Sequence, residues 1–169
     1  MRERLLLGID PGMARTGYGL IRQAPDGALH LVEFGVIETE AGETTVTRLL
    51  ALEAGIEGLL ARHRPVSAAV ERLFFERNVT TAMSVGQARG VALLTVARHG
   101  IAVDEYAPSE IKQAVAGYGG ADKRQMQTMV RTLLAMAEVP RPDDAADALA
   151  VAICHAHVSR TRERLGVAS

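Results

Sequence analysis

The sequence predicts an α/β protein with a mixed sheet of five strands, an antiparallel meander followed by parallel strands, flanked by helices. Two observations favour this class. The first forty residues contain three short apolar runs separated by turn residues, which is typical of a meander. Later, segments with helical spacing of apolar residues alternate with two short apolar runs, which are typical of buried parallel strands. The length of 169 residues and the hydrophobic content of 48% fit a single domain over residues 1–169.

The expected elements follow in chain order. The meander consists of strands at 5–10, 16–23 and 29–37, with Pro25-Asp26-Gly27 as the turn before the third. Next come a helix at 44–63, a strand at 66–70, a helix at 79–98 and a strand at 101–106. Helices at 108–116, 121–136 and 143–157 complete the chain. The charged segment from 160 to 169 is expected to fray.

No segment has the features of a membrane anchor or an export signal. The longest apolar stretches fall short of the roughly 20 residues that span a bilayer, and the first residues lack a signal peptide's apolar length and cleavage site. A single cysteine, Cys154, excludes a disulfide framework and a cysteine-rich zinc site. We therefore expect a cytoplasmic protein that does not contact a membrane.

The net charge of −1 argues weakly against nucleic acid binding, but two divalent cations held by four carboxylates would raise it to about +3. Basic residues also cluster, at Arg62 and Arg64, at Arg72 and Arg77, at Lys123, Arg124 and Arg131, and at Arg160, Arg162 and Arg164. Such clusters either solubilise a protein or contact nucleic acid.

Asp147 is the residue that most strongly suggests a metal site. It lies in D-D-A-A-D-A-L-A-V-A-I-C (residues 143–154), which has the composition of a buried or half-buried helix. An ionised carboxylate there costs several kcal/mol unless it is paired or metal-bound. No Lys or Arg lies three or four residues away, whereas Asp143 and Asp144 occupy those spacings and add negative charge. A divalent cation would relieve this repulsion, with either Asp143 or Asp144 as the second ligand.

Two further acids close apolar strands. Asp10 ends the first strand and Glu71 the fourth, at the carboxyl ends where open α/β sheets bind ligands. An all-carboxylate site selects Mg²⁺ or Mn²⁺, and two such ions could activate a water and stabilise a leaving oxygen in phosphodiester cleavage.

Each of these acids except Asp147 also has a structural explanation. Asp10 could form a turn with Pro11-Gly12, and Glu71 could pair with Arg72 or Arg77. The acids that follow Pro142 could cap a helix.

Aromatic and basic residues follow Glu71. Phe74 and Phe75 are two of three phenylalanines and are flanked by Arg72 and Arg77. An exposed ring beside a phosphate contact could stack on an unpaired base, while the other ring packs under the next helix.

The two lysines are a second candidate contact. Of nineteen Lys and Arg residues, only Lys112 and Lys123 are lysines. Either they are retained by chance or each serves as a compact ammonium donor to a phosphate or a leaving oxygen. Lys123 and Arg124 lie in the first turn of an expected helix, where amides can meet phosphate.

Small residues recur every four positions in the expected helix at 79–98, at Ala82, Gly86 and Gly90. They allow another element to approach closely, either the chain's own sheet or a helix of a second copy.

Several motifs together resemble RuvC-type Holliday junction resolvases. They are G-I-D-P-G with T-G-Y-G (residues 8–12 and 16–19), V-E-x-x-F-F (70–75), G-Q-A-R-G (86–90), D-A-A-D-A-L-A (144–150) and H-x-H-V-S (155–159). The similarity is collinear from about residue 5 to residue 159.

The resemblance implies a ribonuclease-H-like fold and a homodimer formed through the helix at 79–98. It also implies two Mg²⁺ or Mn²⁺ ions per subunit and paired symmetric nicks in four-way DNA junctions during recombination and repair. The family's four acids fall on Asp10, Glu71, Asp144 and Asp147, which selects Asp144 over Asp143.

The resemblance further nominates Phe74 as the ring that stacks on a base, and Lys112 and Lys123 as residues near the junction phosphates. Lys123 would assist departure of the 3′ oxygen. A branch-migration complex of the RuvA–RuvB kind is implied as a partner. We expect this chain itself to bind no nucleotide cofactor.

Two other functions remain open on the residues alone. The acid-and-glycine loop at 10–17 is similar to that of actin-like and sugar-kinase ATPases, although those folds need two such lobes. A junction-binding protein without catalysis would have no reason to keep Asp147.

Overall fold

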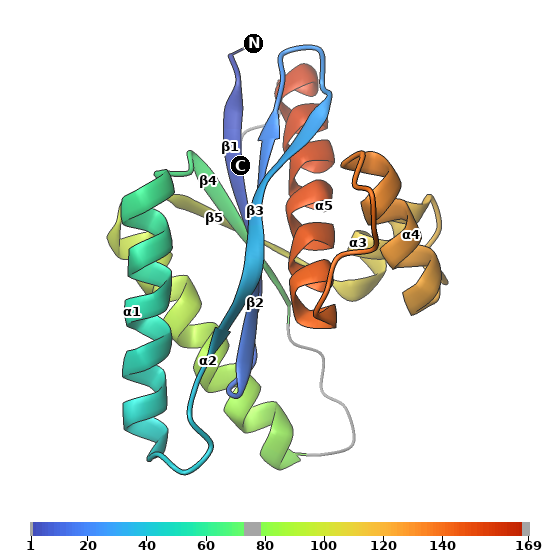
Figure 1. The fold of residues 1–169 in the computed structure, drawn as a ribbon. Helices are drawn as coiled ribbons and strands as arrows, with labels where there is room; N and C mark the ends of the chain where they lie inside the picture. Colours follow the sequence, from blue (N-terminus) through green and yellow to red (C-terminus); the bar gives the residue numbers. More distant parts are fainter. Residues whose placement is uncertain (1, 73–78, 167–169) are drawn as a thin grey trace.

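The computed structural model describes residues 2–72 and 79–166, in which five strands form one mixed sheet in the order β3-β2-β1-β4-β5. The strands are β1 (Arg4–Asp10), β2 (Arg15–Gln23), β3 (Leu29–Glu38), β4 (Ser67–Glu71) and β5 (Ala102–Tyr106). The helices in these residues are α1 (Thr45–His63), α2 (Val79–Arg98), α3 (Pro108–Ala116), α4 (Lys123–Leu133) and α5 (Asp143–Leu165). Helices α1 and α2 cover one face of the sheet, and α5 covers the other face (Figure 1). Helices α3 and α4 pack against α5. The predicted α/β class and its mixed sheet are confirmed.

The register of the sheet brings two acids to one edge. The central strand β1 pairs antiparallel with β2 and parallel with β4, so that Ile9 lies opposite Val70 and Asp10 lies opposite Gly17. Because β1 and β4 run in the same direction, their last residues, Asp10 and Glu71, lie at the same edge. The first turn of α5 also lies at this edge (Figure 1).

Glycines in β1 and β2 let α5 lie directly on the sheet backbone. A Cβ on Gly8 would come 2.2 Å from the carbonyl oxygen of Ala148, and one on Gly17 would come 1.9 Å from that of Asp144. A Cβ on Gly19 would come 2.7 Å from Cδ2 of Leu149. This close approach fixes the depth of α5 and therefore carries its first-turn acids next to the end of β1.

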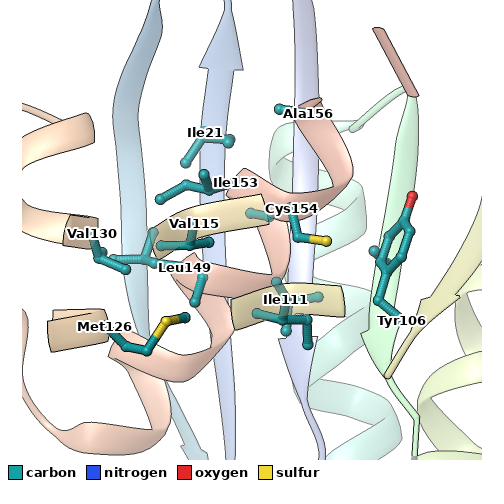
Figure 2. Close-up of a cluster of buried hydrophobic side chains, with 14 of the residues drawn as sticks. Ile21, Tyr106, Ile111, Val115, Met126, Val130, Leu149, Ile153, Cys154 and Ala156 are labelled. Atoms are coloured by element: carbon teal, nitrogen blue, oxygen red, sulfur yellow. The ribbon is translucent and has the colours of Figure 1, made fainter. Parts of the chain in front are cut away.

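The core on the α5 side holds these elements together. Leu149, Ile153 and Cys154 of α5 lie between Ile21 of β2 and the inner sides of α3 and α4, as Figure 2 shows. Leu149 and Ile153 are fully buried. A second cluster fills the space between the other face of the sheet and α1 and α2. The two clusters pack against the sheet from both sides and so hold its strands in place.

A buried polar network crosses the first core. His155 of α5 is 1% exposed, and its Nε2 lies 2.8 Å from Ser67 Oγ while its Nδ1 lies 3.0 Å from the Tyr106 hydroxyl. Burial lowers the pKa of His155 to about 4, although Asp104 opposes the shift. These contacts tie α5 to β4 and β5 and give His155 a structural role.

Acid should destabilise the protein through His155. Its pKa is depressed from about 6.5 when unfolded to about 4 when folded, so the unfolded chain binds the extra proton between these values. The resulting stability is present above pH 6.5 and is lost as the pH falls toward 4, by about 3 kcal/mol. Urea unfolding of the wild type and of His155→Gln at pH 7 and pH 4 should show the difference between them shrinking by that amount. An unchanged difference would mean that His155 is protonated without cost.

The C-terminal helix is longer than predicted. It continues past 157 to Leu165, so residues 160–165, which were expected to fray, are helical in the structure. Arg160 donates to the backbone oxygen of Asp26 in the hairpin turn, and Arg162 pairs with Asp104 at 2.8 Å. These tertiary contacts stabilise a polar segment that has no apolar face of its own.

The other predicted elements agree with the structure to within a few residues, and the largest difference is that α4 spans Lys123–Leu133 rather than 121–136. Asp122 caps α4 by accepting from the backbone N–H of Gln125. No helix in the described ranges combines the length and apolarity needed to cross a membrane.

Candidate active site

Four acids gather at the carboxyl edge of the sheet and are called the acidic cluster below: Asp10, Glu71, Asp144 and Asp147. Asp10 ends β1, Glu71 ends β4, and the other two lie in the first two turns of α5. The side chains of Asp10 and Glu71 share a hydrogen bond, and both aspartates of α5 act electrostatically on Asp10. The structure therefore brings together the four acids that the sequence predicted.

Burial and mutual repulsion raise the pKa of three members of this cluster, Asp10, Glu71 and Asp147. The pKa of Asp10 is raised to about 8, first by burial and then by Glu71, Asp147 and Asp144. Burial also raises the pKa of Glu71 and that of Asp147. The hydrogen bond raises the pKa of Asp10 and lowers that of Glu71, so Asp10 holds the proton and donates it. Such crowding of carboxylates favours a hard cation with several oxygen ligands.

Two cations of the chain approach the acids of α5. Lys123 Nζ lies 3.0 Å from Asp143 Oδ2 and 3.7 Å from Asp147 Oδ2, and Arg15 Nε lies 3.3 Å from Asp144 Oδ2. The sequence showed no basic partner for Asp147 because its partner comes from another helix, α4. Arg15 was missed, and its only sequence signal is its place at the start of β2, just after the turn that follows Asp10.

A pocket of about 230 Å³ opens between the sheet edge, α3, α4 and α5. It is lined by Glu71, Asp147, Lys112 and Lys123 and by Pro108, Ile111, Met126 and Ala150. Lys112 opposes the upward shift of the pKa of Glu71, which agrees with this placement. Both predicted lysines thus face the same pocket as two of the acids. A larger pocket of about 720 Å³, between β3 and the segment 134–141, contains none of them.

The donor set fits a divalent cation by its chemistry. All four candidate ligands are carboxylates, and their shared negative charge suits Mg²⁺ or Mn²⁺ rather than Zn²⁺. The side chains as positioned form ion pairs instead, and among the residues described no group of three or more His, Cys, Asp or Glu is arranged to hold a metal ion.

Metal binding should therefore release a proton near neutral pH. Asp10, with a pKa of about 8, is protonated at pH 7 and must lose its proton to become a ligand. We expect the apparent Mn²⁺ affinity to rise up to about tenfold per pH unit below pH 8 and to level off above it. Calorimetry in buffers of different ionisation enthalpy measures the released proton directly. A Mn²⁺ affinity that stays constant from pH 6 to pH 8 would contradict the raised pKa.

Comparison with known proteins identifies the family. The family model for crossover junction endodeoxyribonuclease RuvC matches residues 6–155. The chain belongs to the RuvC family. The RuvC of Chloroflexus aggregans is 58% identical over 161 residues, covering 95% of this chain and 98% of the relative, and that of a Roseiflexus species is 54% identical over 94% of each.

Comparison with solved structures points to the same family. The structure of Thermus thermophilus RuvC has a TM-score of 0.86 at 38% identity and covers 93% of this chain and 96% of its own. A second structure, T. thermophilus RuvC in complex with a Holliday junction substrate, has a TM-score of 0.88 at 36% identity and covers 94% and 96% of the two chains. The expected RuvC resemblance and its ribonuclease-H-like fold are confirmed.

The remaining predicted contact residues of this RuvC-family chain divide into three groups. Arg72 is exposed, and its Nη2 donates to the backbone oxygen of Glu105 at 3.4 Å. This contact differs from the pairing with Glu71 that the sequence left open. Arg124 is exposed in the first turn of α4. Phe74, Phe75 and Arg77 lie outside the described residues.

The members of the predicted small-residue stripe of α2 differ in exposure along the helix. Ala82 is 8% exposed, which favours packing within the chain, and its place in a dimer interface stays a prediction. Gly86 is half-buried, and Gly90 is exposed with no atom near its Cβ position. Large apolar residues share the exposed side of this helix, namely Val79, Met83 and Leu94 at 67%, 64% and 56% exposure.

Proposed function

We propose that this chain performs its endonuclease reaction at the acidic cluster and cuts four-way DNA junctions there by paired symmetric nicks. The chain is a metal-dependent endodeoxyribonuclease of the RuvC family. The observation that supports the location is the gathering of four carboxylates at one sheet edge, with the pKa of Asp10 raised to about 8. A solved relative that carries a Holliday junction substrate supports the choice of DNA.

The acidic cluster would hold two Mg²⁺ or Mn²⁺ ions per subunit. Asp10 and Glu71 contribute from rigid strand ends, and the acids of α5 contribute from a helix fixed on the sheet. Bound divalent cations supply a water nucleophile of lowered pKa and stabilise negative charge on phosphate oxygens.

The lysines of the pocket complement these acids. Lys112 and Lys123 line it from α3 and α4, so a phosphate entering it meets two ammonium groups opposite Glu71 and Asp147. We assign Lys123 the donation of a hydrogen bond or proton to the leaving 3′ oxygen, because it lies nearest the α5 acids. Arg72 and Arg124 would contact the DNA backbone, and Phe74 or Phe75 would stack on an unpaired base.

Paired nicks require two active sites, which a homodimer supplies. The exposed apolar side of α2, with Val79, Met83, Gly90 and Leu94, is the surface we assign to the second copy. We also propose a cytoplasmic location and cooperation with a RuvA–RuvB-like branch-migration complex, as family membership suggests.

The deciding experiment incubates the purified protein with a labelled four-way junction and with a linear duplex of the same sequence, in Mg²⁺, Mn²⁺ or EDTA. We expect symmetric nicks in the junction alone and none in EDTA. Several junction sequences guard against a missed cleavage preference. Junction binding without nicks in either metal, for every sequence, would contradict the proposal.

A further inference from the structure

The first turn of α5 contains two acids, Asp143 and Asp144, and the proposed function does not use Asp143. Asp143 lies four residues and Asp144 three residues before Asp147, and both spacings suited a second metal ligand, but the structure separates the two neighbours. Asp144 lies beside Arg15 of β2, whereas Asp143 lies beside α4. Asp143 is the first residue of α5, next to the acidic cluster but outside it.

Three donors converge on the Asp143 carboxylate. Lys123 Nζ lies 3.0 Å from Oδ2, while Gln127 Nε2 and Arg141 Nη1 lie 3.0 and 3.3 Å from Oδ1. Lys123 and Gln127 are one helical turn apart on α4, so both oxygens of one carboxylate fasten the start of α4 to the start of α5.

Lys123 has two acids within reach, and Asp143 is the nearer. The distance to Asp147 is 3.7 Å, against 3.0 Å to Asp143, and the lysine side chain is 56% exposed. A flexible, exposed lysine without Asp143 would either turn into solvent or move onto Asp147. The second outcome would set the ammonium group in competition with a metal ion for one of its ligands.

We propose that Asp143 is a positioning residue that holds Lys123 in the lining of the pocket and keeps its contact with Asp147 the longer of the two. This inference rests on the proposed function of the acidic cluster. An ordinary surface ion pair between such exposed groups would contribute little to stability and would not affect cutting. The two explanations therefore differ in whether Asp143 acts through Lys123.

The test is a double-mutant cycle. Asp143→Asn keeps the shape and one acceptor oxygen but removes the charge that holds Lys123. We expect single-turnover cutting of a four-way junction in Mn²⁺ to fall by about tenfold to a hundredfold, as for a misplaced reactive group. Asp143→Glu should restore most of the rate. In a Lys123→Met background, Asp143→Asn should have little further effect on cutting.

A second readout does not need cutting. Calorimetric titration with Mn²⁺ alone should show weaker binding in Asp143→Asn, because Lys123 then competes for Asp147. The loss should be smaller in the Lys123→Met background. Glu53→Gln is the matched control, since it removes an exposed ion pair with Arg98 on the α1–α2 side of the sheet and should change neither readout.

Two results would overturn the inference. One is an equal effect of Asp143→Asn with and without Lys123. The other is wild-type cutting and Mn²⁺ binding in Asp143→Asn. Failure of the proposed function would be distinct, because the wild-type protein itself would then leave every junction intact while the Mn²⁺ titration still reported on Asp143.

Discussion

Asp10→Asn should abolish junction cutting while leaving a folded protein that still binds the junction. Asp10 is the most strongly perturbed carboxyl of the acidic cluster, and its neighbours Glu71, Asp144 and Asp147 all act on it electrostatically. An amide cannot supply the charge that a divalent cation needs at the centre of this group. We expect the single-turnover rate in Mn²⁺ to fall by about a thousandfold or more, a loss typical of a group that acts as part of a catalytic unit.

The same substitution should make the metal-free protein more stable. The pKa of Asp10 is raised to about 8 in the folded state, so the folded chain holds a proton that the unfolded chain releases above about pH 4. Stability is therefore lost as the pH rises from about 4 through 8, and Asn removes this loss. Urea unfolding in EDTA at pH 7 should show Asp10→Asn more stable than wild type by about 4 kcal/mol.

Two outcomes would contradict the assignment of Asp10. One is near wild-type nicking by Asp10→Asn, because the residue would then not belong to the catalytic unit. The other is a stability gain as large at pH 4 as at pH 7, because the gain would then come from packing rather than from the proton. Glu3→Gln is a suitable control, since Glu3 pairs with Arg22 and both side chains are about half exposed.

The sequence predicted the acids better than their partners. Asp10 and Glu71 close apolar strands, and the carboxyl ends of parallel strands meet at one edge. The local sequence pattern was therefore sufficient to predict that these two side chains lie close together. The partners Lys123 and Arg15 come from other elements, α4 and β2, and reach α5 only through the tertiary arrangement. Spacing along one helix cannot reveal a contact between two helices.

Tertiary contacts also explain the errors at element ends. Residues 160–164 are polar and gave no helical pattern, yet Arg160 binds the hairpin turn and Arg162 binds Asp104. Ala82 matched a small-residue spacing, but every fourth residue of a helix drifts around its axis. The stripe therefore runs from the buried side of α2 at Ala82 to the exposed side at Gly90.

Gly17→Ala should impair the active site without touching any of its side chains. A Cβ there would lie 1.9 Å from the carbonyl oxygen of Asp144 and 2.4 Å from its carbonyl carbon. Both are backbone atoms in the first turn of α5, so no rotamer change can relieve the overlap, and the helix end must move off the sheet. We expect a loss of about 1–3 kcal/mol in the free energy of unfolding.

Displacement of that helix end would carry Asp144 and Asp147 away from Asp10, which is fixed at the end of β1. A shift of about 1 Å between reacting groups costs on the order of a hundredfold in rate, so cutting should fall far more than junction binding. Gly58→Ala is the matched control, because no atom lies within 4 Å of its Cβ position in α1 and alanine favours helices. If Gly17→Ala retained wild-type stability and cutting, the close approach of α5 would not be what assembles the acidic cluster.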